Sequence, residues 1–178
     1  MRVIAGSAGG IRLDAPRDRL TRPITDRVKE TLFAILGERV VDARALDLYA
    51  GSGAIGIEAL SRGASHATFV DRSREAVELI RRNLQRTHLE SQARVVGMKV
   101  DRFLADNAED RYDLAFLDPP YEVRAILAPL ERLGPMLAPG ATVVVKAFWR
   151  TPIPAPDGLR PWRERRFGET ALTFLEVP

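Results

Sequence analysis

At 178 residues the chain has the length of a single globular domain, since domains commonly run to roughly 100–150 residues. Hydrophobic residues make up 46% and charged residues 29%, a composition that argues against disorder, and no apolar run approaches the roughly 20 residues that cross a bilayer. With a net charge of only +3, no cysteine, two scattered histidines and an opening unlike a signal peptide, we expect a cytoplasmic protein without metal or membrane.

The opening segment predicts a small β-hairpin. Residues 2–12 contain two short runs of apolar residues around a Gly9-Gly10 turn, which would place Arg2 and Arg12 on an exposed face. A polar stretch with Thr21-Arg22-Pro23 follows, and a helix is expected from about Asp26 to Leu36, where apolar residues recur at helical spacing. We therefore divide the chain into an N-terminal extension, residues 1–24, and a main domain, residues 25–178.

The main domain alternates strands with helices. Strands are expected at 45–49, 66–70, 94–97, 112–117 and 142–145, and helices at 55–60, 73–87, near 103 and at 125–136. Residues 151–158 contain three prolines and a glycine and predict a loop, and a last, reversed strand is expected around 172–175. This alternation is typical of an α/β fold with a doubly wound, mostly parallel sheet.

Basic residues gather at both ends of the chain. Residues 1–29 carry seven basic side chains against three acidic ones, and residues 160–166, Arg-Pro-Trp-Arg-Glu-Arg-Arg, form a second basic cluster beside an aromatic ring. The middle of the chain is slightly acidic. This distribution favours a polyanionic partner held through phosphate contacts.

A glycine-rich segment, Asp47 to Gly56, lies where a strand turns into a helix. Glycines allow a ligand to approach the backbone closely, and a helix N-terminus offers unpaired N–H groups. Asp71 ends the next strand, where a carboxylate can accept both hydroxyls of a ribose. The residues expected to bind a nucleoside cofactor are Asp47, Tyr49, Ala50, Gly51, Ser52, Gly53, Asp71 and Arg72.

The same spacing also fits a dinucleotide-binding loop, so an NAD-dependent or flavin-dependent oxidoreductase is a competing interpretation. Asp47 favours S-adenosylmethionine, because a carboxylate four residues before Gly51 would repel a pyrophosphate but can hold the donor's amino group through water.

The segment Asp118-Pro119-Pro120-Tyr121 directly follows a predicted strand and indicates chemistry on a base amine. The exocyclic amine of a base is a poor nucleophile, since its lone pair is delocalised into the ring. If the Asp118 carboxylate and the Pro119 carbonyl each accept one amine hydrogen, the lone pair turns toward the methyl group, and the carboxylate stabilises the developing positive charge. Pro120 stiffens the turn, and Tyr121 offers a face on which the base can stack. Asp118 is also expected to contact the donor, and the four residues are the predicted catalytic set.

The order of these motifs, together with Glu58-Ala-Leu-Ser-Arg-Gly-Ala64 and Phe167-Gly-Glu-Thr170, resembles the bacterial small-subunit ribosomal RNA guanine-N2 methyltransferase family over nearly the whole chain. The resemblance implies a class I methyltransferase fold with a seven-stranded sheet, S-adenosylmethionine as methyl donor and one guanine of 16S rRNA as target. It also implies that the N-terminal hairpin grips RNA, with Arg2, Arg12, Arg22 and Tyr121 as substrate contacts. We expect the rRNA to be methylated within a partly assembled subunit.

One position departs from the family pattern. Relatives often have an acidic residue just after the third strand, near the donor's adenine, whereas this chain has Lys99, with Asp101 two residues later. The adenine contact is therefore open between Asp101 and the backbone of residues 98–100. Other interpretations of the chain are a different RNA or DNA amino-methyltransferase, an NAD-dependent oxidoreductase and a non-catalytic RNA-binding module.

Overall fold

The computed structural model describes residues 1–16, 24–119 and 124–178. In chain order its elements are α1 (Asp26–Leu36), η1 (Gly37–Val40), β1 (Arg44–Leu48), α2 (Ala54–Ser61), β2 (His66–Asp71), α3 (Arg74–Thr87), η2 (Glu90–Gln92), β3 (Ala93–Gly97), α4 (Val100–Asp106), β4 (Tyr112–Leu117), α5 (Arg124–Leu133), η3 (Gly134–Met136), β5 (Leu137–Phe148), β6 (Arg160–Phe167) and β7 (Thr170–Glu176).

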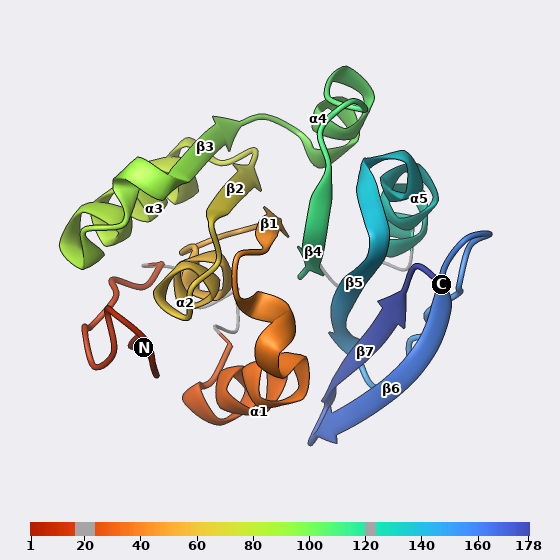
Figure 1. The fold of residues 1–178 in the computed structure, drawn as a ribbon, viewed down its shortest axis with the longest axis horizontal. Helices are drawn as coiled ribbons and strands as arrows, with labels where there is room; N and C mark the ends of the chain where they lie inside the picture. Colours follow the sequence, from red (N-terminus) through yellow and green to blue (C-terminus); the bar gives the residue numbers. More distant parts are fainter. Residues whose placement is uncertain (17–23, 120–123) are drawn as a thin grey trace.

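The strands form one sheet in the order β3-β2-β1-β4-β5-β7-β6 (Figure 1). The strands β1 to β5 run parallel to one another, whereas β7 runs antiparallel to both β5 and β6. The chain order reverses between β1 and β4, and open α/β sheets bind their ligands at such a switch point, outside the carboxyl ends of the strands. The predicted doubly wound, mostly parallel seven-stranded sheet with a reversed terminal strand is confirmed.

Strand β6 was not predicted, because its sequence lacks the alternation of a half-buried strand. Of its eight residues, only Trp162 and Phe167 are partly buried, and four are arginines. Strand β6 lies at the edge of the sheet, and charged residues on edge strands prevent pairing with other chains. The basic cluster recognised in the sequence is thus the edge of the sheet itself.

The helices cover both faces of the sheet (Figure 1). Helices α1, α2 and α3 pack on one face around Phe69, Phe116 and Val144, whereas α4 and α5 pack on the other around Leu117, Val143 and Val145. Local signals set the helix starts. The hydroxyl of Thr25 accepts a hydrogen bond from the Val28 N–H, and that of Ser73 accepts one from Ala76.

The N-terminal segment differs from the predicted hairpin, because it contains a single antiparallel bridge, Arg2↔Arg12, in place of two strands. Its backbone is bound by α2 instead. The Glu58 carboxylate accepts from the N–H groups of Ile4 and Ala5, at 2.8 and 3.1 Å. A Cβ at Gly6 would lie 1.7 Å from the Ser61 carbonyl oxygen, so the segment touches the end of α2 directly.

This segment shares the core of the main domain, since Val3, Ala8 and Leu13 are buried against it. In Figure 1 it lies beside α2. The division into residues 1–24 and 25–178 remains a prediction about function.

Candidate functional site

Four charged side chains come together at the carboxyl ends of the central strands. In the sheet register Asp47 lies beside Phe69 of β2 and Phe116 of β4, and Asp71 and Asp118 each follow two residues after these phenylalanines. Side chains two residues apart on a strand share a face, so the three carboxylates lie on the face covered by α1, α2 and α3. Lys146 of β5 completes the group through an ion pair with Asp118.

The glycine loop between β1 and α2 has the geometry that the motif requires. Gly51 and Gly53 have φ angles of 56° and 76°, in the left-handed region that glycine tolerates best. A Cβ at Gly51 would meet no atom nearer than 4.0 Å, so the loop leaves space beside its backbone. Gly56 has a different role, because a Cβ there would lie 2.3 Å from the Phe69 ring. It allows α2 to pack closely on β2.

Tyr49 takes a φ of 61° without being glycine, which makes it a strained position within the loop. Burial and, to a smaller extent, the nearby charge of Asp101 raise the pKa of its hydroxyl to about 12. The first turn of α4 therefore lies close to the loop, on the side where the adenine contact was expected. Lys99 is exposed and is the N-cap residue of α4, but its side chain makes no capping hydrogen bond.

The Asp71 carboxylate fixes the loop from β2. One oxygen accepts from the N–H of Gly51 at 2.9 Å and the other from the N–H of Ser73 at 2.9 Å. Each carboxylate oxygen has two lone pairs, so both can accept a further hydrogen bond. Asp71 is partly exposed and can therefore hold the loop and accept ligand hydroxyls at the same time.

Asp47 is buried, and its carboxylate accepts from the N–H of Gly56 in the first turn of α2, at 2.9 Å. Burial raises the pKa of Asp47 to about 8; the Gly56 N–H opposes this shift, and the charges of Asp118 and Asp71 add to it. Near pH 7 the group is largely protonated in the protein without ligand. Repulsion of a pyrophosphate by Asp47 is therefore weaker than the sequence argument assumed.

Asp118, directly after β4, is paired with Lys146. The Lys146 ammonium lies 2.8 and 2.7 Å from the two carboxylate oxygens. Burial raises the pKa of Asp118, and the Lys146 charge opposes that shift. The sequence analysis missed Lys146. A signal was present, namely one charged residue at the end of the apolar run Val143-Val144-Val145.

A second residue that the sequence analysis missed connects the glycine loop to the N-terminal segment. Asn83 of α3 is fully buried, and its amide nitrogen donates to the carbonyl oxygens of Ser52 and Asp14, at 2.9 and 3.1 Å. Its amide oxygen accepts from the Asp14 N–H at 2.8 Å. The Ser52 hydroxyl also contacts the Met1 sulfur at 3.4 Å.

The remaining predicted residues are distributed as follows. Ala50 donates its N–H to the Val70 carbonyl at 3.2 Å, and Arg72 is exposed beside Asp71. Arg2 is exposed and paired with Asp26 at 3.1 Å.

Pro119 is buried next to Asp118. Arg22, Pro120 and Tyr121 lie outside the described residues, so their predicted roles stay predictions.

Comparison with known proteins identifies the family. The sequence profile of the family described as Conserved hypothetical protein 95 matches residues 1–176. The chain belongs to this family. Relatives named Ribosomal RNA small subunit methyltransferase D, from Escherichia coli K12 and Haemophilus influenzae, are 37% and 33% identical to it. The alignments cover 99% and 94% of this chain, and 89% of each relative.

Solved structures agree with this assignment. A chain from Escherichia coli, described as a candidate methyltransferase, is 34% identical, with a TM-score of 0.87 over 99% of this chain and 97% of its own length. A hypothetical protein from Thermus thermophilus is also 34% identical, with a TM-score of 0.85 over 99% of both chains. The named relatives confirm the family resemblance found in the sequence, and the solved structures together with the strand order confirm the class I methyltransferase fold.

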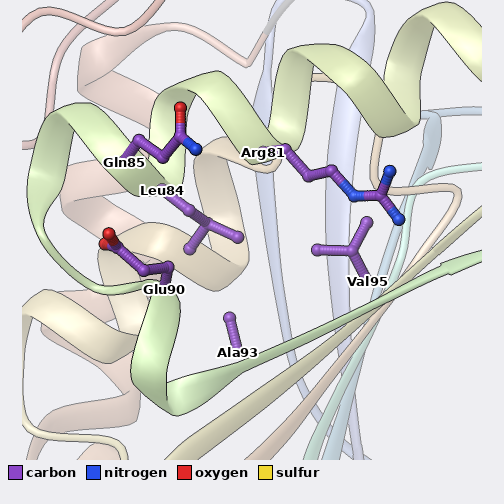
Figure 2. A pocket seen from close by; sticks show the side chains of 6 residues that line it. All are labelled: Arg81, Leu84, Gln85, Glu90, Ala93 and Val95. Carbon is purple, nitrogen blue, oxygen red and sulfur yellow. The ribbon is translucent and has the colours of Figure 1, made fainter.

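Outside this site, the protein has a shallow hollow of about 250 Å³ between α3 and the start of β3. Figure 2 shows its lining, with Arg81 and Gln85 above and Ala93 below. It contains none of the predicted site residues. In the described ranges, no group of three histidine or acidic side chains is arranged to hold a metal ion, and no helix is long and apolar enough to span a membrane.

Proposed function

We propose that this protein transfers a methyl group from S-adenosylmethionine to the exocyclic N2 amine of one guanine in 16S rRNA. The observation that carries the proposal is the position of Asp118 on the same sheet face as Asp47 and Asp71, beside the glycine loop. The names of the full-length relatives support small-subunit rRNA as the substrate. Guanine N2 as the target atom follows the family resemblance recognised in the sequence.

The residues present fit the methyl donor. The open space beside Gly51 accommodates its methionine part, and the free lone pairs of Asp71 suit the ribose hydroxyls. When bound, S-adenosylmethionine would supply a methyl group on a cationic sulfur. The amine nitrogen bonds to the methyl carbon, and the sulfur leaves as a neutral thioether with the electron pair of the C–S bond. Asp47 holds the first turn of α2 through the Gly56 N–H, and the positive charge of a bound donor favours the ionised form of Asp47, which balances that charge.

Asp118 acts on the nucleophile. Its carboxylate and the adjacent Pro119 carbonyl each accept one hydrogen of the base amine, which localises the nitrogen lone pair. The carboxylate then stabilises the positive charge that develops on this nitrogen. The proton released afterwards passes to solvent water. The partly buried, preorganised pair with Lys146 keeps the carboxylate in place during this change.

The RNA is held at the basic ends of the protein, by residues 1–24 and by strand β6. Arg163 and Arg165 on β6 are exposed and have no carboxylate partner within the described residues. Their guanidinium groups suit bidentate phosphate contacts. The protein acts in the cytoplasm on a partly assembled small subunit, because a protein of this size requires the shape of the particle to select one guanine.

The test is methylation in vitro with isotope-labelled donor. Small-subunit particles and naked 16S rRNA from cells lacking the gene are incubated with the protein, and the RNA is digested and analysed by mass spectrometry. We expect label in N2-methylguanosine, from one rRNA position, and more label from particles than from naked RNA. Label in N6-methyladenosine or N4-methylcytidine would instead assign another amino-methyltransferase activity.

A further inference from the structure

The ion pair between Lys146 and Asp118 occupies an unusual place in the sheet. Lys146 lies in a stretch of β5, residues 141–147, in which all the other residues are buried. Its side chain is 11% exposed and that of Asp118 30%. The ammonium contacts both carboxylate oxygens, at 2.8 and 2.7 Å.

Stability alone gives little reason for this pair. Removing an ammonium and a carboxylate from water costs free energy that their attraction often fails to recover, and apolar residues of similar size commonly replace such pairs without loss. The neighbours of Lys146 on β5, Val145 and Ala147, are apolar and belong to the core. An apolar residue at position 146 would continue this run. The pair therefore indicates a role at the site.

We propose that Lys146 is a positioning residue for the methyl transfer, which holds Asp118 ionised and oriented as the acceptor of the base amine. This inference rests on the proposed function. An ionised carboxylate is an acceptor at both oxygens, whereas a protonated Asp118 would present an O–H donor toward the amine hydrogens. The two oxygens have about four lone-pair sites, so two remain for the amine when Lys146 occupies one on each.

The surroundings of Asp118 would otherwise favour its protonation. Burial raises its pKa, and Asp47 on the neighbouring strand β1 is close enough for the two groups to repel each other when both are ionised. Asp71, on β2, adds a further negative charge to this face. Lys146 is the cation in contact with Asp118 among the described residues, and it alone opposes these effects.

The first experiment measures the ionisation of Asp118 directly. The protein is labelled with ¹³C-aspartate, the Asp118 carboxyl signal is assigned by its loss in Asp118→Asn, and it is titrated by NMR. An opposite charge in contact typically lowers a carboxyl pKa by about 1–3 units. We expect Lys146→Met to raise the midpoint by about that amount, and Lys146→Arg to keep it near the parent value. An unchanged midpoint in Lys146→Met would overturn the inference, whatever the activity.

The second experiment measures single-turnover methylation against pH, with saturating donor. The acidic limb of the plot of methylation rate against pH should move to higher pH in Lys146→Met and stay in place in Lys146→Arg. Lys29→Met is the matched control. The Lys29 ammonium lies 3.0 Å from the Glu58 carboxylate in a buried ion pair that does not include Asp118. It should lower stability and leave the limb unchanged.

A double substitution distinguishes an effect through Asp118 from a separate effect of Lys146. In the Asp118→Asn background the carboxylate is absent, so adding Lys146→Met should change turnover less than threefold. A loss as large as in the parent background would show that Lys146 acts independently of Asp118, which contradicts the proposal. If the NMR midpoint shifts but the parent forms no N2-methylguanosine, the Lys146 inference stands and the proposed substrate is wrong.

Discussion

Asn83 joins the carbonyl oxygen of Ser52 in the glycine loop to that of Asp14 in the N-terminal segment, with donor–acceptor distances of 2.9 and 3.1 Å. One buried amide thus connects a loop assigned to the methyl donor with a segment assigned to RNA. Because the amide is fully buried, water cannot readily replace it, and losing it would leave the two carbonyl oxygens without a hydrogen-bond donor at a cost in folding free energy.

Replacing Asn83 by alanine should therefore weaken both the fold and the donor site. Leaving buried polar groups unpaired typically costs about 1–3 kcal/mol, so we expect Asn83→Ala to lower the free energy of unfolding by this amount in urea titrations. Donor affinity should also fall in calorimetry, because Ser52 loses its anchor. Gln85→Ala, on the exposed side of the same helix, is the control and should change neither quantity. Equal donor affinity in Asn83→Ala and the parent would contradict the link.

Asp47 should make the free protein less stable as pH rises. Its pKa is about 8 in the folded protein, against an ordinary value of 3.8, so between these values the folded state binds one more proton than the unfolded state. Stability therefore falls with increasing pH through this range. Asp47→Asn keeps an oxygen acceptor for the Gly56 N–H and removes the titration.

The measurement is thermal unfolding of the parent and of Asp47→Asn from pH 5 to pH 8.5. The gain in melting temperature from Asp47→Asn should be larger at pH 8 than at pH 5. Asp157→Asn, in an exposed loop, is the control and should follow the parent at every pH. A gain that does not grow with pH would show that Asp47 is not held protonated by burial.

The sequence predicted the central part of this molecule better than its borders. Strands β1, β2 and β4 are short apolar runs with an aspartate at or just after the carboxyl end, namely Asp47, Asp71 and Asp118, so topology alone places these carboxylates at one edge of the sheet. Strand β6 was missed because its arginines hide the periodicity of a strand at an edge.

Partnerships between distant residues were also beyond the sequence. Lys146 and Asp118 are 28 positions apart, and Asn83 and Ser52 are 31 positions apart. No local pattern relates such residues; only the register of the folded sheet and the packing of α3 bring them together. The predicted N-terminal strands were reduced to one bridge because Glu58 and Ser61, more than 50 positions away, bind the backbone of residues 4–8.

The basic ends should make RNA binding depend strongly on salt. We expect the slope of log affinity against log salt concentration to become less steep by about 0.7 to 0.9 for each phosphate contact that is lost. Arg163→Ala with Arg165→Ala, and separately Arg2→Ala with Arg12→Ala and Arg17→Ala, should flatten the plot while donor binding is unchanged. Arg160→Ala is the control on β6, because two nitrogens of Arg160 are held by the Glu176 carboxylate, at 2.9 and 2.7 Å, whereas Arg2 makes a single hydrogen bond to Asp26. An unchanged slope would exclude the altered segment as an RNA contact.

Calorimetry should separate the methyl donor from a dinucleotide. We expect S-adenosylmethionine and S-adenosylhomocysteine to bind and NAD not to bind, since the named relatives of this chain are methyltransferases. The Asp71 oxygens keep lone pairs for the ribose of the donor while they hold the loop through Gly51. Asp71→Ala should weaken binding of both nucleosides by removing these acceptors. Binding of NAD without any response to S-adenosylmethionine would overturn the assignment of the loop.

The last prediction concerns Asp118. Asp118→Asn keeps an oxygen acceptor for one amine hydrogen but loses the charge, whereas Asp118→Ala loses both and leaves the Lys146 ammonium without its partner. Removing a well-placed electrostatic group typically costs on the order of 100- to 1,000-fold in turnover, or roughly 3–4 kcal/mol. We expect Asp118→Ala to lose activity within or below that range, and Asp118→Asn to retain measurably more.

The free energy of unfolding should fall more in Asp118→Ala than in Asp118→Asn. The alanine leaves the Lys146 ammonium without a partner, whereas the asparagine amide oxygen can still accept a hydrogen bond from it. Donor affinity should change little in either variant, since Asp118 is assigned to the base, and single-turnover methylation with saturating donor separates the chemical step from binding. Should Asp118→Ala methylate RNA as fast as the parent, Asp118 is not the acceptor of the amine. The carboxylate that the mechanism requires would then have to be sought among the other acidic groups of this face, of which Asp47 lies nearest along the sheet.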